Sequence, residues 1–175
     1  MAKDLPNEVR SFLDYSKNSI DDYLASSVKI ESTGSLNNLR EIIADIFRNK
    51  VKPYYSQKGI IINNGIFNFL LEPLKNAHFH GGTRKNHATL FELFLSPSVL
   101  VSSYADGGPY FTREDVKQFW ENKRLFSEKH RVSNKEIGYE VGTPLIYGMA
   151  DLIHVNTASG RLYLGLSVLG HYFTL

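Results

Sequence analysis

Polar side chains recur at intervals of four residues between positions 64 and 80, and their types suit phosphate and metal chemistry. The set consists of Asn64, Asn68, Glu72, Asn76 and His80. Residues four apart lie about 40° apart around an α-helix, so these side chains would share one face. The solvated face of an amphipathic helix is the alternative, but such a face normally carries Lys, Glu and Arg. The pattern therefore offers a general base, Glu72, beside a neutral oxygen ligand, Asn76, and Mg²⁺ accepts few protein oxygens together with water and phosphate.

Two glycine-containing loops are the other candidate binding segments. Residues 105–111 (Ala-Asp-Gly-Gly-Pro-Tyr-Phe) directly follow a predicted strand. There Asp106 could accept a hydrogen bond from a ligand amino group while the glycines admit that ligand, and an ordinary turn is the alternative. Residues 138–144 precede a predicted helix, whose free N–H groups could bind phosphate beside Gly142 and Thr143, and a simple helix cap is the alternative.

Positive charge gathers in one stretch of the chain. Between Lys123 and Lys135, five basic residues stand against Glu128 alone, which gives +4, whereas the whole chain carries only +2. A solvated surface loop is one interpretation of this stretch. A cationic flap over a polyanion is the other.

The elements that must position these residues follow from hydrophobic periodicity and turn chemistry. Apolar residues at helical spacing predict helices over residues 7–24, 36 to about 50, and 60–80. Alternating or β-rich runs predict strands over residues 26–33, 88–95, 99–104, 151–157 and 161–168. Turn residues at 96–98 and 158–160 predict two hairpins, and shorter helices are expected over 113–122 and 144–150. Because helices come early and strand pairs late, we expect an α+β fold: a two-layer sandwich whose mostly antiparallel mixed sheet is covered on one face by helices.

Composition limits the class of protein. The 175 residues, 42% of them hydrophobic, fit one domain spanning 1–175, and the lack of Cys excludes a disulfide scaffold and a thiolate site. No apolar run is long enough for a membrane span, the first residues lack a secretory signal, and the surplus charge is too small to indicate nucleic acid. We therefore expect a soluble, cytoplasmic protein. A zinc cluster of His78, His80 and His87 has no nearby Cys or acidic ligand to complete it, so ordinary histidines are favoured.

The order and spacing of three motifs resemble a known family. These are Glu-x-x-x-Asn-Ala-x-x-His-Gly from Glu72 to Gly81, Asp-x-Gly-x-x-Phe after a hairpin, and a glycine-containing loop before Leu-Ile-x-x-x-Ala-Asp. Together they resemble the GHKL (Bergerat-fold) ATPases, which include DNA gyrase, histidine-kinase catalytic domains and the anti-sigma-factor serine kinases. The resemblance covers about residues 26–168 and implies ATP or ADP with Mg²⁺ as cofactors.

For the first motif, the resemblance implies a role at four positions. Asn76 matches the Mg²⁺-chelating Asn of the family, and Glu72 matches the general base of its gyrase and anti-sigma-kinase branches. His80 falls where the family often has a residue on the phosphate side, and Gly81 completes this nucleotide-binding motif.

For the other two motifs, the resemblance implies adenine and phosphate contacts. Asp106 matches the carboxylate that accepts the adenine N6 hydrogen bond, with Gly108 beneath the ring. Gly142 matches the second glycine of the lid motif, and Thr143 follows it. Residues from about 123 to 142 then become the ATP lid, and their positive charge opposes the triphosphate.

The sequence also departs from the family pattern. Pro73 interrupts the helix directly after Glu72, and Glu140 introduces an anion at the first lid glycine. Tyr110 replaces a common Gly, and Arg161 stands where the family usually has a Thr near the adenine.

We therefore expect a Mg-ATP-binding, stand-alone serine/threonine protein kinase or anti-sigma-like regulator that acts on a protein partner and could form a homodimer. A nucleotide-dependent interaction module without useful chemistry is one alternative, and the departures favour it. An isolated histidine-kinase-type catalytic domain is another. No His precedes residue 78, so the N-terminal helical extension at 1–25 offers no phosphoacceptor, which excludes a complete histidine kinase.

Overall fold

The computed structural model describes residues 5–13, 22–31, 35–78, 88–105, 149–156, 158–167 and 173–174. Helices and strands alternate irregularly along these ranges, as expected for an α+β fold. In chain order, the elements are α1 (Asn7–Phe12), β1 (Leu24–Ile30), α2 (Leu36–Ile46), the π-helical segment η3 (Phe47–Val51), α3 (Lys52–Ser56), β2 (Ile61–Ile62), α4 (Gly65–Asn76), β3 (Thr89–Leu95), β4 (Val99–Ala105), β5 (Leu152–Asn156), β6 (Arg161–Ser167) and β7 (Phe173–Thr174).

Five strands form the main sheet, in the order β1-β3-β4-β6-β5. Every pairing between its described strands is antiparallel, so the mixed sheet expected from the sequence is not seen among them. Both predicted hairpins are confirmed: β3 pairs with β4, and β5 pairs with β6. The second turn contains Gly160 at a φ of 60°, a backbone conformation that glycine adopts without steric cost.

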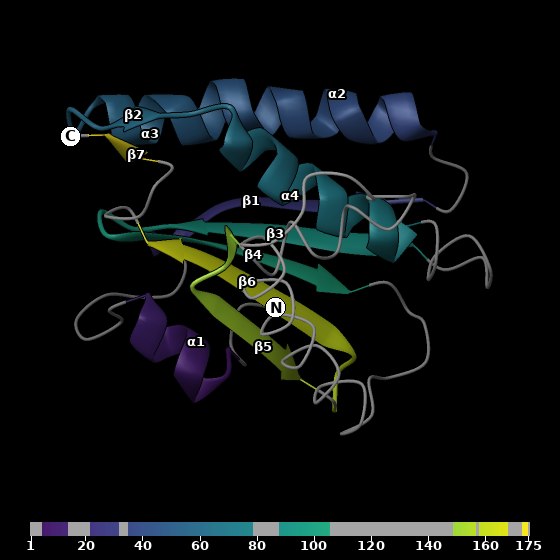
Figure 1. Cartoon of the computed structure of the whole chain (residues 1–175). Helices are drawn as coiled ribbons and strands as arrows, with labels where there is room; N and C mark the ends of the chain where they lie inside the picture. Colours follow the sequence, from purple (N-terminus) through teal and green to yellow (C-terminus); the bar gives the residue numbers. More distant parts are fainter. Residues whose placement is uncertain are drawn as a thin grey trace, which may run out of the picture.

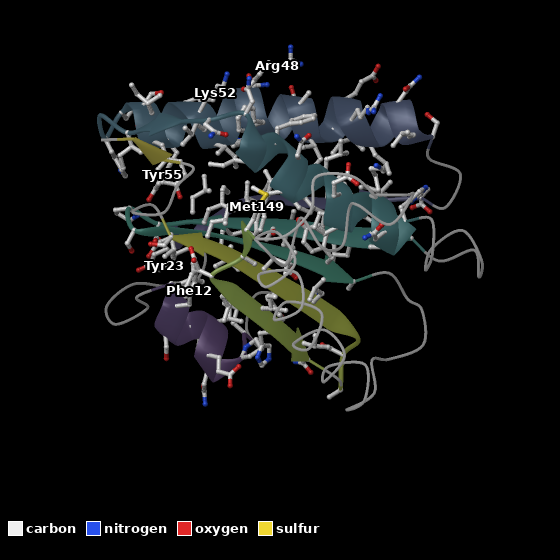
Figure 2. The ribbon with its side chains drawn as sticks, viewed as in Figure 1. Phe12, Tyr23, Arg48, Lys52, Tyr55 and Met149 are labelled. Carbon is white, nitrogen blue, oxygen red and sulfur yellow. The ribbon has the colours of Figure 1, made fainter. Side chains whose placement is uncertain are left out.

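Helices α2, α3 and α4 cover one face of this sheet (Figure 1). Strand side chains alternate between the two faces, and Phe91, Leu93 and Leu95 of β3 pack toward these helices. The buried residues of this layer include Leu39, Ile43 and Ile46 of α2, Phe69, Leu70 and Leu74 of α4, and Phe91, Leu93, Leu100 and Leu164 of the sheet. Tyr55 extends from α3 toward the sheet (Figure 2), where its Oη donates a hydrogen bond to the carbonyl oxygen of Val99 at 3.0 Å.

The helix that begins at Leu36 continues further than its sequence predicts, to Ser56 instead of about residue 50. Pro53 is the obstacle, because an interior proline lacks an N–H donor and crowds the carbonyl four residues earlier. The segment η3 accommodates it. The N–H of Lys52 bonds to the carbonyl of Phe47, five residues back, and Pro53 then falls in the first turn of α3, where no donor is required.

Helix α1 packs on the opposite face of the sheet (Figure 1), so the expectation that helices cover one face only is incomplete. The apolar stripe of α1 explains why this helix packs there. Leu5, Val9 and Leu13 are buried against a second apolar cluster formed by Leu24, Phe94, Val99, Val101, Leu152 and Tyr163. The ring of Phe12 lies directly over the backbone of Gly165. Glu8 on the outer side of α1 pairs with Nδ1 of His154 on β5 at 2.5 Å.

Two further predicted helices have different bounds in the structure. The helix predicted over 7–24 is wrong at its C-terminal end, because Leu24 begins β1. The helix predicted over 60–80 begins only at Gly65, since the side chain of Asn63 accepts a hydrogen bond from Gly65 N and forms a turn before it. The helix predicted at 113–122 and most of the one at 144–150 lie outside the described residues.

Candidate functional site

The polar stripe of α4 lies opposite its apolar face, as the four-residue spacing predicts. Ile66, Leu70 and Leu74 are fully buried against the sheet and α2. Along the stripe, Asn68 is exposed, whereas Glu72 and Asn76 are half-buried. The C-terminal half of α4 therefore holds its carboxylate and its carboxamide in a partly desolvated position, one turn apart on one helix face.

Lys75 joins this face, and the four-residue spacing did not identify it. Its Nζ donates to both carboxylate oxygens of Glu72, each at 2.9 Å. The two side chains are 27% and 22% exposed, so the pair is partly shielded from water. The sequence signal that could have found Lys75 is the three-residue spacing of opposite charges, which places them on neighbouring positions of a helix surface.

Pro73 does not separate Glu72 from Asn76. The helix continues through Pro73 to Asn76, and the ring of Pro73 is buried with the apolar face. Proline cannot donate to the carbonyl of Phe69, so one bond of the helical ladder is missing there. Both candidate residues nevertheless belong to one continuous helix.

A buried hydrogen bond joins α4 to the end of β4. The Oη of Tyr104 donates to the carbonyl oxygen of Leu70 at 3.2 Å. Burial raises the pKa of Tyr104, so its hydroxyl keeps its proton and remains a donor. Asp106 follows Ala105, the last residue of β4, in the sequence and lies outside the described residues. The carboxyl end of β4 is thereby attached to the buried side of α4, the helix that carries the polar stripe on its other side.

Arg161 lies on the other face of the sheet. Residues 161, 163 and 165 of β6 alternate with Leu162 and Leu164, which pack toward α2 and α4. The guanidinium of Arg161 pairs instead with Glu92 of β3, whose side chain is only 2% exposed. Burial raises the pKa of the neighbouring Tyr163, and the charge of Arg161 opposes this effect. The departure from the family pattern at this position therefore places its charge away from Glu72 and Asn76.

The remaining predicted site residues lie outside the described residues: His80, Gly81, Asp106, Gly108, Gly142 and Thr143. The predicted lid at about 123–142, with Glu140, lies outside them too, as do His80 and His87 of the suggested zinc cluster. In the ranges that the structure does describe, no three His, Cys, Asp or Glu side chains are grouped to hold a metal ion. None of the helices in these ranges has the length and apolar character needed to cross a membrane.

The arrangement of α4 thus brings together a carboxylate, an ammonium group and a carboxamide: Glu72, Lys75 and Asn76. A carboxamide oxygen is a suitable Mg²⁺ ligand beside phosphate, and the carboxylate is a suitable proton acceptor. Comparison of the chain with models of protein families, with curated proteins and with solved structures found no match.

Proposed function

We propose that the protein binds Mg-ATP at α4 and the end of β4, and acts as a serine/threonine protein kinase or anti-sigma-like regulator on a protein partner. One observation carries this proposal: the Tyr104 hydrogen bond to Leu70 joins the strand that precedes Asp106 to the helix that carries Glu72 and Asn76. Two motifs that lie 30 residues apart in the sequence are thus attached to adjoining elements. The resemblance to the GHKL ATPases supplies the identity of the ligand.

Each residue has a distinct role in this proposal. Asn76 would hold Mg²⁺ through its side-chain oxygen, and the ion would neutralise phosphate charge. Asp106 would accept the adenine amino group. Glu72 would take the proton of the partner's hydroxyl as that oxygen attacks the γ-phosphorus, while the bond from phosphorus to the bridging oxygen breaks and ADP leaves.

A second candidate function is a nucleotide-dependent interaction module without turnover. The observation that favours it is the pairing of Lys75 with both oxygens of Glu72, since the oxygens that would receive the hydroxyl proton already accept hydrogen bonds from an ammonium group. Both candidates predict nucleotide binding, and they differ in phosphate transfer.

Calorimetric titration of Mg-ATP and Mg-ADP tests what the two candidates share. We expect the wild type to bind both, Asn76→Ala to weaken the Mg²⁺-dependent part, and Asp106→Asn to weaken binding about 10- to 100-fold, as the loss of a charged hydrogen-bond acceptor predicts. Asn68→Ala is the matched control, because this carboxamide lies on the same stripe but is exposed. Failure of the wild type to bind either nucleotide at millimolar concentration would contradict both candidates.

Transfer of radiolabelled γ-phosphate separates the kinase from the module. The kinase predicts that Glu72→Ala binds Mg-ATP but transfers phosphate at least about 100-fold more slowly, the scale of a lost general base. Glu41→Ala, which removes an exposed carboxylate of α2, should leave transfer unchanged. Equal transfer rates for Glu72→Ala and wild type would refute the role of Glu72, and binding without any transfer would favour the module.

A further inference from the structure

Glu72 and Lys75 neutralise each other on α4. They are the only carboxylate and the only cation among residues 65–76, and both carboxylate oxygens accept from the same ammonium group at 2.9 Å. Arg161 is committed to Glu92 on the other face of the sheet. Lys75 is therefore the charged donor that lies beside the proposed base, one residue before the proposed metal ligand, Asn76, in the sequence.

An ammonium group in this position has two competing anions when a nucleotide binds. One is the Glu72 carboxylate, and the other is the phosphate chain placed against Asn76. Lysine is a flexible point charge with three donors, so it can move from one anion to the other without a change of the backbone. Hydrogen bonds between charged groups are the strong ones, and a terminal phosphate offers more charge and more acceptor oxygens than a carboxylate does.

We infer that Lys75 distinguishes a nucleoside triphosphate from a diphosphate, by leaving Glu72 for the γ-phosphate. This inference rests on the proposed function and adds a positioning residue to it. When the γ-phosphate is absent, Lys75 keeps both oxygens of Glu72 occupied. When the γ-phosphate is present, Lys75 moves to it and Glu72 is released to accept a proton. The pairing that favours an inactive module thus becomes a means of restricting base chemistry to the ATP-bound state.

The test measures the ATP preference, defined as the Kd of Mg-ADP divided by the Kd of Mg-ATP. Lys75→Met keeps the unbranched stem and the helix propensity but removes the charge. We expect it to weaken Mg-ATP about tenfold and to change Mg-ADP by less than twofold. Lys75→Arg, which keeps the cation, should retain most of the preference. Lys29→Met is the matched control, because it removes the cation of an exposed Lys–Glu pair at the end of β1, away from α4.

The variant Glu72→Gln tests the inference more sharply than Lys75→Met does. It frees Lys75 from its carboxylate partner, so we expect the ATP preference to rise severalfold even though phosphate transfer is lost. Removal of a carboxylate also reduces its direct repulsion of phosphate, and the double variant Glu72→Gln/Lys75→Met separates the two effects. The rise should vanish in the double variant if Lys75 is its cause.

Two results overturn the inference while nucleotide binding itself stands. One is an ATP preference that Lys75→Met leaves at the wild-type value. The other is a rise with Glu72→Gln that persists in the double variant, because repulsion alone would then explain it. A wild-type protein that binds neither nucleotide removes the proposed function and this inference together, so the two failures are distinguishable. Thermal unfolding of each variant verifies that it is folded before its affinity is compared.

Discussion

Gly165 is the position where a single methyl group should disturb the α1 face of the sheet and leave the other face intact. A Cβ at this position would lie 2.4 Å from Cε1 and 2.9 Å from Cδ1 of Phe12, and 3.0 Å from Cβ of Leu152. Gly165 is a strand residue, and the glycines with positive φ among the described residues are Gly59 and Gly160. Gly165→Ala therefore meets no backbone strain, and a compatible Gly→Ala change ordinarily stabilises a protein by about 0.4–1 kcal/mol. Steric contact with Phe12 should reverse that sign.

The size of this destabilisation follows from the burial that the ring of Phe12 must lose. Contacts this short force the ring to move, and its removal from the sheet loses part of the roughly 1.5–3 kcal/mol that full burial of such a side chain provides. Overpacking typically costs about 1–3 kcal/mol. Because Phe12 is only half-buried, we expect Gly165→Ala to lower the free energy of unfolding by about 1–2 kcal/mol.

Urea unfolding followed by circular dichroism measures this change, and a double-mutant cycle assigns its cause. Phe12→Ala alone should also destabilise, since it loses apolar burial on the sheet. In the Phe12→Ala background the ring is gone, so Gly165→Ala should be nearly neutral. An alanine at position 165 that stabilises the wild type, or that costs as much without Phe12 as with it, would refute the assignment.

Three further predictions concern other contacts. Burial raises the pKa of Tyr55 and Tyr104 from the ordinary value of 10.0, so the folded state retains protons that the unfolded state releases. The contribution of these two tyrosines to stability should be constant below pH 10 and fall above it by about 1.4 kcal/mol per pH unit for each tyrosine, and Tyr104→Phe should remove one such contribution from denaturation curves measured at several pH values. Ser35→Ala should lower stability by about 1 kcal/mol in thermal unfolding, because its Oγ accepts from the N–H of Asn38 at the start of α2. Arg161→Met should cost about 3–5 kcal/mol in urea unfolding by leaving the charge of Glu92 buried and unpaired, whereas the pair Glu92→Leu/Arg161→Met should regain most of that loss.

Much of the fold could be predicted because its signals are local. The hairpin between β3 and β4 follows from two β-rich runs and a turn in which Ser96 Oγ accepts from Val99 N at 3.0 Å. The shared face of Glu72 and Asn76 follows from their spacing alone. A proline such as Pro53 ordinarily indicates the end of a helix, however, and only the π-helical segment before it shows how the helix continues. The change from hydrogen bonds four residues back to hydrogen bonds five residues back could not be predicted from the residue types.

Contacts between distant segments could not be predicted in the same way. Arg161 has the same neighbours in sequence whichever face it takes, and the register of β6 against β4 decides that it meets Glu92. Likewise, nothing near Tyr104 in the sequence indicates that its hydroxyl reaches the carbonyl of Leu70, 34 residues away. The stripe on α4 could thus be recognised from sequence, whereas its attachment to β4 required the structure.

The contact between Glu8 of α1 and His154 of β5 has a consequence for synthesis of the chain. His154 follows Glu8 by 146 residues, so at about 5–20 residues per second a ribosome needs roughly 7–30 s to add it. Throughout that interval, Leu5, Val9 and Leu13 have no finished sheet to cover them, and a six-residue helix is too short to persist alone. This segment is therefore synthesised before the sheet that covers it and is among the last to fold, and a chaperone that binds apolar peptides would find it exposed in that interval.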